Sequence, residues 1–443
     1  MIEQPPKIEQ KNFSKALKML KDKDCLSKIR AINDKYYYWD KVKYQNVDCS
    51  YSPIDLWTAV KLSRHIDYKY LKFGDYTFSF TQTDFIQRVL HEFDLNVGGN
   101  LGSQKLMPEE DKDKYLVSSI MEEAIASSQM EGAVTTRKKA KEMLRKNDKP
   151  RSKSEQMILN NYRTIQHIVN HKNENLTPDN LLVIHKLITS NTLDEKQYEG
   201  AYRNTNDIYV VNHVDSEVVH TPPDFKEIQG IVKQICDFFN NDNHEFFIHP
   251  ILKGIIIHFL IGYAHPFVDG NGRTARALFY WYLLSKGYWL AEYLSISRLI
   301  IKSKSQYEKA YLYTENDEND LTYFLNYNLK TMELAFEALR KYIQRKIEEK
   351  KYITNFQRIS HINERQAEIL KMYYDESNLI LTVKEIETRF IVSNQTARAD
   401  LLQLVDSGFI EIIQANKKKQ IFVRTDNFER LVKEKLTTTR GQK

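Results

Sequence analysis

The stretch ILKGIIIHFLIGYA at residues 251–264, followed by HPFVDGNGRTAR at 265–276 and ALFYWYLL at 277–284, decides the fold of this chain. The first and last segments are apolar on nearly every side, and helices of that composition belong in the middle of a protein core. The polar stretch between them contains two glycines and an asparagine, which favour a loop. The sequence therefore predicts two buried helices, 251–264 and 275–284, that are joined by a polar loop.

The composition of the whole chain also favours helices. Among 443 residues there are only 14 glycines and 10 prolines, too few for a collagen-like, linker-rich or turn-dense all-β protein. We therefore expect a mainly α-helical protein of about three domains, since a domain averages roughly 150 residues. The net charge of +6 is weak for this length. It permits contacts with nucleic acid or ATP but does not indicate a surface covered in basic charge.

Cysteine usage and apolar run lengths bear on the compartment. The cysteines Cys25, Cys49 and Cys236 show no paired spacing, which indicates neither a disulfide framework nor a thiolate zinc site. The first residues, MIEQPPKIEQKNF, lack the apolar core of a signal peptide. The longest apolar run, Ala277–Leu284, is far shorter than the roughly 20 residues that cross a bilayer. We expect a cytoplasmic protein with no membrane partner.

The spacing of apolar residues predicts the remaining elements. Strand-like alternation at Tyr76, Phe78 and Phe80 predicts a strand, and the apolar runs 208–211 and 218–219 predict a short β-hairpin. Residues 96–107 contain three glycines and are expected to form a loop, and the basic residues 137–149 are expected to be exposed. Helices are expected over 13–32, 54–65, up to 93 from a cap at Thr81 or Thr83, from 115 onward, and over 154–171, 177–191, 224–240 and most of 295–350.

The polar loop carries residue types that suit phosphate chemistry. A glycine-rich loop that opens a helix exposes backbone N–H groups at the positive end of the helix dipole. Asp269 supplies a hard oxygen ligand, and Mg²⁺ takes one or two carboxylates together with substrate phosphates. Arg273 and Arg276 can clamp further phosphate oxygens. His265 can accept a proton near neutral pH.

This loop resembles the signature of the Fic family, HPFx(D/E)GNGRxxR, and matches every fixed position. The resemblance extends more loosely from about 115 to 330 and includes Gly200 and Arg203 ahead of the predicted hairpin. It implies a helical bundle with a β-hairpin flap, formed by Tyr209, Val210 and Val211, that holds a target protein. The implied activity is transfer of AMP from Mg-ATP to a Ser, Thr or Tyr hydroxyl of that target.

The resemblance also implies a role for each residue of the motif. His265 would be the general base, Phe267 would anchor the loop in the core, and Asp269 would hold Mg²⁺. A relative that transfers a phosphoryl group has lysine where this chain has Gly272, so glycine favours AMP transfer. No residue firmly selects adenine over uracil or guanine. The residues implied in catalysis or nucleotide binding are His265, Asp269, Gly270, Asn271, Gly272, Arg273 and Arg276.

A second motif, SSQMEG at residues 127–132, resembles the inhibitory sequence (S/T)xxxE(G/N) of the same family. Ser127 and Glu131 are four residues apart on a predicted helix that ends before Gly132, so their side chains share one face. The resemblance implies that Glu131 pairs with Arg276 and tilts ATP out of position for attack. In some relatives this glutamate instead promotes removal of AMP, and the sequence leaves the direction open.

Residues 358–436 resemble a winged helix-turn-helix domain. Helices are expected at 364–374, 383–390 and 393–406, the last ended by Gly408, and strands at 410–413 and 420–423. Residues 358–443 contain 15 basic and 12 acidic residues, a small excess for DNA binding. Protein contact or dimerisation is an equally good interpretation. The residues expected on the DNA side are Arg398, Lys417, Lys418 and Lys419.

These patterns divide the chain into an N-terminal accessory region at 1–110, a Fic catalytic domain with its inhibitory helix at 111–350, and the C-terminal domain at 358–436. An alternative function is a DNA-binding transcriptional regulator whose Fic domain senses a nucleotide. Members of the family often dimerise, so a homodimer is also expected. The histidines whose spacing fits no metal cage are His213, His220, His249 and His258.

Overall fold

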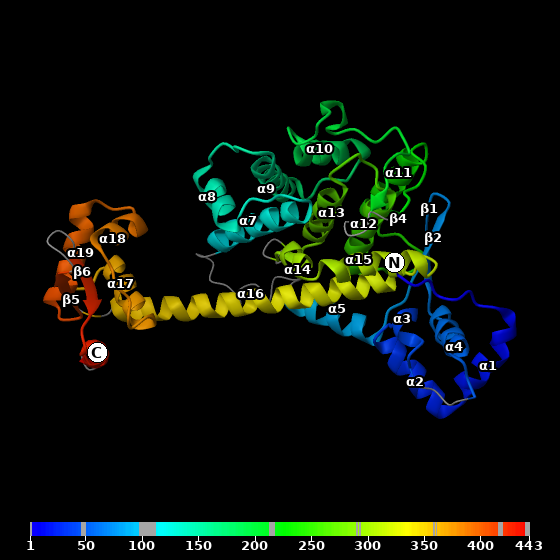
Figure 1. Cartoon of the computed structure of the whole chain (residues 1–443), viewed down its shortest axis with the longest axis horizontal. Coiled ribbons are helices and arrows are strands. Elements are labelled where there is room, and N and C mark those ends of the chain that lie inside the picture. Colours follow the sequence, from blue (N-terminus) through cyan, green and yellow to red (C-terminus); the bar gives the residue numbers. More distant parts are fainter. Residues whose placement is uncertain are drawn as a thin grey trace. The chain divides into compact units, whose positions relative to one another are not determined.

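The computed structural model of the chain describes residues 2–45, 50–96, 112–211, 218–288, 291, 294–357, 359, 361–414 and 420–438. They belong to two compact units, Met1–Leu339 and Arg340–Lys443, and helices dominate both (Figure 1). This confirms the mainly α-helical prediction. Among the described residues, every helix is too short or too polar to cross a lipid bilayer.

Helices α12 (Pro250–Ala264) and α13 (Asn271–Ser285) form the centre of the first unit. Their apolar side chains are almost completely buried, which confirms the two predicted core helices. The predicted start of the second helix at residue 275 is wrong, because α13 begins at Asn271. Gly270 has a left-handed φ of 84° and its carbonyl accepts the N–H of Thr274 at 2.9 Å, so the helix starts within the glycine-rich stretch.

Other helices surround this pair, and all were predicted except α8, whose residues were expected only to be exposed and which buries Ala140, Met143 and Leu144. They begin at caps that the sequence contains, such as Ser152 and Thr177, whose hydroxyls accept backbone N–H groups of the first turn. The predicted hairpin is present as β3 (Val210–Val211) and β4 (Val218–His220), and His213 lies outside the described residues. The surrounding helices are α7 (Lys112–Met130), α8 (Arg137–Lys146), α9 (Lys153–His171), α10 (Pro178–Thr189), α11 (Ile228–Asn240), α14 (Ile296–Lys302), α15 (Lys304–Asn316) and α16 (Thr322–Gln357).

The N-terminal region differs from prediction in one helix and one strand. The expected helix 13–32 is interrupted at Asp22, whose carboxylate accepts the N–H groups of Asp24 and Cys25 and starts a new helix. The sequence pattern also missed β1, which pairs with the predicted strand β2. Most of the expected loop 96–107 lies outside the described residues. The elements are α1 (Gln10–Lys21), α2 (Lys23–Asp34), α3 (Trp39–Val42), α4 (Pro53–His65), β1 (Lys69–Phe73), β2 (Tyr76–Phe80) and α5 (Asp84–Asn96).

A buried polar network joins these N-terminal helices to the turn between α15 and α16. Lys61 Nζ lies 2.9 Å from Asp317 Oδ1, and both side chains are almost fully buried. The hydroxyls of Tyr36 and Tyr68 each donate to Asp320 Oδ2 at 2.6 Å. Because a buried carboxylate without a partner is costly, these contacts fix the N-terminal helices to the rest of the unit.

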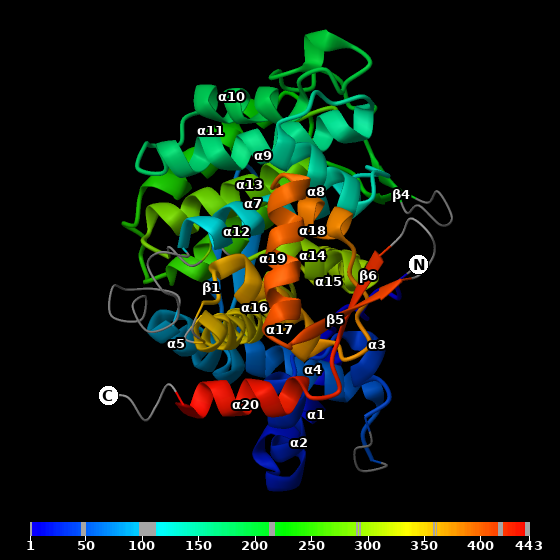
Figure 2. The same ribbon diagram turned by 90° about the vertical axis from the view of Figure 1, so that its left-hand side faces the viewer.

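The second unit is a small domain with its own apolar core. The predicted helices and strands are confirmed, whereas the last helix, α20, was missed; Figure 2 shows the β5–β6 hairpin beside α19. Gly408 has a left-handed φ of 79° and ends α19 as expected. Lys417, Lys418 and Lys419 lie outside the described residues. The elements are α17 (Glu364–Asp375), α18 (Val383–Phe390), α19 (Asn394–Asp406), β5 (Ile410–Gln414), β6 (Gln420–Arg424) and α20 (Phe428–Thr438).

We expect Lys61→Ala to destabilise the first unit by about 3–5 kcal/mol, because it leaves the Asp317 carboxylate buried without its cation. The matched control is Lys15→Ala, which removes a mostly exposed lysine from a pair with Asp55 and should hardly change stability. Urea unfolding followed by circular dichroism measures both. Equal midpoints for the two variants would show that the network does not stabilise the unit.

Candidate active site

The backbone of His265, at the end of α12, lies in the left-handed region. Its φ and ψ are 45° and 58°, a conformation that costs a residue with a Cβ about 1–2 kcal/mol. Arg203 holds it there: its Nε donates to the carbonyl of His265 and its N–H to the carbonyl of Pro266, both at 2.9 Å. Such strain persists only where surrounding contacts impose it, and it is concentrated at functional sites.

One ring contact of His265 shows which nitrogen carries the hydrogen, and the burial of the ring determines its charge. Nδ1 lies 3.2 Å from the carbonyl oxygen of Gly262, which can only accept, so Nδ1 carries the hydrogen. Burial lowers the pKa of His265 to about 4, so the ring is neutral at pH 7. Nε2 therefore has a free lone pair and can take a proton.

The α12–α13 loop, residues 265–270, is closed by the side chain of Asn271. Its Oδ1 accepts the N–H of Phe267 at 3.0 Å, and its Nδ2 donates to the carbonyl of Phe267 at 2.8 Å. The phenyl ring of Phe267 is fully buried, as predicted for an anchor. The first N–H groups of α13 have no acceptor within the helix, and such a helix start is suited to bind an anion.

His185 of α10 supports this loop, and the sequence reasoning missed it. Its ring stacks on Phe267 with centroids 3.7 Å apart and planes 5° apart. Nδ1 accepts the N–H of Gly200 at 3.1 Å, so Nε2 carries the hydrogen and donates to the carbonyl of Asp269 at 2.8 Å. Burial lowers the pKa of His185 to about 4, which keeps it in this neutral form. Its sequence context, VIHKLI, gives no signal beyond a buried helix.

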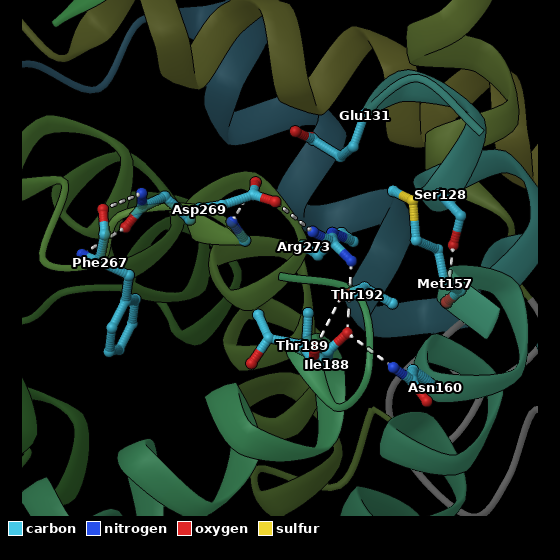
Figure 3. A network of polar contacts seen from close by, with 12 residues as sticks. Ser128, Glu131, Met157, Asn160, Ile188, Thr189, Thr192, Phe267, Asp269 and Arg273 are labelled. Carbon is cyan, nitrogen blue, oxygen red and sulfur yellow. Dashed lines mark hydrogen bonds and ion pairs between the residues drawn. The ribbon is translucent and has the colours of Figure 1, made fainter. Parts of the chain in front are cut away.

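Arg273 lies under the loop, between Asp269 and the carbonyl of Ile188 (Figure 3). The respective distances are 3.4 and 3.3 Å, and only 1% of its side chain is exposed. Its Nε is buried and finds no hydrogen-bond partner among the described residues. Such a guanidinium group has unused capacity to bind an anion.

Asp269 is the candidate metal ligand. Half of its side chain is exposed; Oδ1 accepts the N–H of Gly270 at 2.5 Å, and within the described part of the chain Oδ2 has only the long contact with Arg273. Within the described ranges, no three His, Cys, Asp or Glu side chains cluster as a metal cage. A single accessible carboxylate beside an anion site nevertheless fits Mg²⁺, which is held largely by substrate phosphates and water.

Arg276 contacts the second motif, SSQMEG at residues 127–132. Its Nη2 lies 2.8 Å from Glu131 Oε1, and its Nε donates to the hydroxyl of Ser127 at 2.8 Å. Burial raises the pKa of Glu131, but the guanidinium groups of Arg276 and Arg273 outweigh it, so the net pKa is lowered and Glu131 is ionised. A Cβ at Gly272 would lie 2.3 Å from Glu131 Oε1. The carboxylate therefore lies directly against the first turn of α13.

Polar contacts fix α7, the helix that Glu131 directly follows. The carboxylate of Glu123 accepts the N–H of Ser297 at 3.0 Å and also binds its hydroxyl. The hydroxyl of Ser128 donates to the carbonyl of Met157 at 3.2 Å (Figure 3). Glu131 thus projects from a helix end that is held on both sides, and Gly132 follows it with a left-handed φ of 94°.

The segments on both sides of the β3–β4 hairpin are linked to His265 through Arg203. Arg203 also donates to the carbonyls of Thr205, at 2.9 Å, and of Pro223, and so ties the segments before and after the hairpin to the loop. Tyr209 and Val211 are exposed and Val210 is half-buried. These three residues are therefore accessible from solvent.

His220, at the end of β4, binds an acceptor through each ring nitrogen. Nε2 lies 2.8 Å from the carbonyl of Tyr263, and Nδ1 lies 2.8 Å from the carboxylate of Glu315 on α15. Burial lowers the pKa of His220, but these two partners outweigh it and the net pKa is raised. Only the imidazolium form satisfies both contacts, so a charged pair joins the hairpin to α15.

The predicted DNA-facing residues are only partly described. Arg398 on α19 is exposed and its Nη2 lies 3.4 Å from Gln420 Oε1 of β6. It belongs to the second compact unit, whereas the motif residues belong to the first.

Comparison with known proteins matches residues 175–283 to the Fic/DOC family. The protein adenylyltransferase Fic of Nematostella vectensis is 25% identical over 167 residues, which cover 38% of this chain and 35% of that protein. The protein of the same name from Drosophila virilis is 30% identical over 113 residues, which cover 26% of this chain and 21% of that protein. The matches thus span about a third or less of these relatives.

Solved structures of similar proteins also carry the family's name. A Fic family protein from Desulfovibrio desulfuricans G20 aligns with a TM-score of 0.46 and 19% identity, over 77% of this chain and 94% of that chain.

We expect His220→Gln to lose stability relative to the unmutated protein at about pH 6 and much less at about pH 9. The pKa of His220 is raised on folding, so the charged pair with Glu315 stabilises fully below the unfolded pKa of about 6.5 and is lost as pH rises through the folded pKa. Thermal unfolding at both pH values measures this. The exposed His91→Gln is the matched control, and a difference that does not change with pH would contradict the charged pair.

Proposed function

Because residues 175–283 match the Fic/DOC family, we propose that this chain is a protein adenylyltransferase that moves AMP from ATP to a Ser, Thr or Tyr hydroxyl of a target protein. The observation that carries the proposal is the neutral ring of His265, with Nε2 free, beside a helix start that can bind an anion. A base and a phosphate site side by side are the parts that nucleotidyl transfer requires.

In the proposed reaction, the triphosphate binds the N–H groups at the start of α13 together with Arg273 and Arg276. The hydroxyl oxygen of the target attacks the α-phosphorus and its proton passes to Nε2 of His265. The bond from the α-phosphorus to the bridging oxygen breaks, and pyrophosphate leaves. The negative charge of the bound nucleotide raises the pKa of His265 from its value in the free protein, which makes the ring a stronger base.

Asp269 is the residue that would hold Mg²⁺, which neutralises phosphate charge when bound. Phe267 and His185 keep the loop in shape by stacking, and Arg203 holds His265 at its strained backbone angles. These three residues act through position, since chemistry at a phosphate depends on alignment within about 1 Å.

We assign Glu131 the role of a brake on this reaction. Its carboxylate neutralises Arg276 and lies over Gly272, where it repels an incoming phosphate and fills part of its space. Ser127 supports the contact through its own hydrogen bond to Arg276. In the alternative form of the proposal, the same carboxylate activates water and the enzyme mainly removes AMP from its target.

The rest of the chain is assigned on the same basis. Residues 1–110 are an accessory region, residues 111–350 the catalytic domain and residues 358–436 a winged helix-turn-helix domain. Tyr209, Val210 and Val211 form a flap that aligns the target segment. We propose that the protein acts in the cytoplasm and assembles as a homodimer.

We expect Glu131→Gly to raise AMP transfer by about 100-fold, because it frees Arg276 and the space above Gly272. Intact-mass analysis after incubation with Mg²⁺ and each nucleoside triphosphate reveals self-labelling and identifies the nucleotide. The double variant Glu131→Gly/His265→Ala is the control, and it should lose at least 100-fold of this rate. Equal labelling by Glu131→Gly and the unmutated protein would exclude the brake, and undiminished labelling by the double variant would exclude His265 as the base.

A second candidate function, a DNA-binding regulator, is favoured by the exposed face of α19. Its exposed residues include Asn394, Gln395 and Arg398, whose amide and guanidinium groups are the types that read base edges in the major groove. A domain that only senses a nucleotide needs no base, so it would leave the available Nε2 of His265 without a purpose. We therefore rank this function second.

We expect Arg398→Ala to weaken binding to a specific DNA duplex, if one exists, by 5–100-fold, roughly the value of one good base contact. A gel shift with genomic fragments finds such a duplex, and label transfer from ATP is measured in parallel. Sequence-specific retention of DNA without any label transfer by Glu131→Gly would favour the regulator over the transferase. Failure to retain any fragment would exclude it.

A further inference from the structure

The positive charge of this chain is concentrated in one short segment. Residues 135–153, which include α8 and the turn that leads to α9, contain nine basic and two acidic residues. Their net charge exceeds the +6 of the whole chain, so the rest of the chain is slightly negative. The proposed transferase chemistry uses none of these residues.

Some of these cations are already paired with acids of the neighbouring helices. Arg137 Nε lies 2.6 Å from Glu122 Oε2 of α7, and Lys141 binds the same carboxylate. Lys139 lies 2.6 Å from Glu155 Oε1 of α9. The apolar side of α8 packs into the core formed with α7 and α9 through Ala140, Met143 and Leu144. One side of the helix is therefore fully committed to the fold.

The opposite side carries cations that are free to bind a partner, together with Glu142, which is paired with Lys146. Lys138, Arg145, Lys149 and Arg151 are exposed and form no ion pair with the described part of the chain. Lys138 and Arg145 are seven residues apart, two helical turns, and so project from the same face about 10 Å apart along the axis. Lys149 and Arg151 follow the helix end in sequence and are also exposed.

These cations fit a repeating anion better than a protein surface or a single phosphate. Between Thr136 and Lys153 every exposed residue is polar or charged. A protein interface has an apolar centre from which charged residues are depleted, which this face lacks. A small phosphate ligand would need convergent donors, whereas Lys138 and Arg145 are separated along the helix. A nucleic-acid backbone presents regularly spaced phosphates that such separated cations can contact.

We propose that the outward face of α8 and the following turn, the residues Lys138, Arg145, Lys149 and Arg151, bind the phosphate backbone of duplex nucleic acid without reading its sequence. When four cations bind phosphates, about four counterions leave the nucleic acid. A plot of the logarithm of the binding constant against the logarithm of the salt concentration therefore has a slope of about −4. The interaction is independent of the proposed AMP transfer and of α19.

The test uses the full chain, a labelled duplex of about 20 base pairs with arbitrary sequence, and fluorescence anisotropy over a range of salt concentrations. The triple variant K138Q/R145Q/K149Q should bind at least tenfold more weakly at low salt, and its slope should be smaller by about three. The matched control K18Q/K21Q/K28Q removes the same number of exposed cations from α1 and α2 and should bind like the unmutated protein. Thermal unfolding checks that both variants are folded.

Three outcomes would overturn the proposal. The triple variant could bind with unchanged affinity and slope. Binding could instead be lost with Arg398→Ala alone, which would assign it to α19. Polyglutamate could compete as well as unlabelled duplex at equal charge, which would identify the partner as an acidic protein.

Discussion

The pair of hydrogen bonds between the Asn271 side chain and the backbone of Phe267 is the constraint on which the candidate site depends. It closes the α12–α13 loop, places the ring of Phe267 in the core and fixes the residue at which α13 begins. With the loop closed, the strained backbone of His265 and the free N–H groups at the start of α13 lie at its two ends. Both buried helices are needed to hold that geometry, since their packing determines the distance that the loop must span.

Three arginines supply most of the positive charge of the candidate site, and each has different partners. Arg203 binds backbone carbonyls and therefore shapes the loop without neutralising any acid. Arg273 is buried, and its Nε has no hydrogen-bond partner in the described ranges, whereas Arg276 is paired with Glu131. A planar guanidinium group that is always charged can serve each purpose, whereas lysine could not bind several carbonyls in fixed directions. The site is therefore positive, and Glu131 is the carboxylate that offsets this charge at Arg276.

Much of this site could be predicted because its information is local in sequence. The apolar helices, the polar loop and the four-residue spacing of Ser127 and Glu131 each depend on neighbouring residues. His185 was missed because its partners, Phe267 and the carbonyl of Asp269, lie about eighty residues away, and a histidine in an apolar helix has the same pattern whatever it contacts. The interruption at Asp22 was missed because the apolar spacing continues across it, while the cap hydrogen bonds that break the helix depend on backbone angles.

Gly272 shows how one residue can meet two requirements. The family resemblance connects a glycine here with the way a triphosphate lies in the site. In this structure the same missing side chain also lets Glu131 approach α13, because a Cβ would lie 2.3 Å from its carboxylate oxygen. Any side chain at position 272 would therefore disturb the pair between Glu131 and Arg276 as well as the anion site. The proposed choice of reaction and the proposed brake would thus be coupled at this position, and neither would change there without affecting the other.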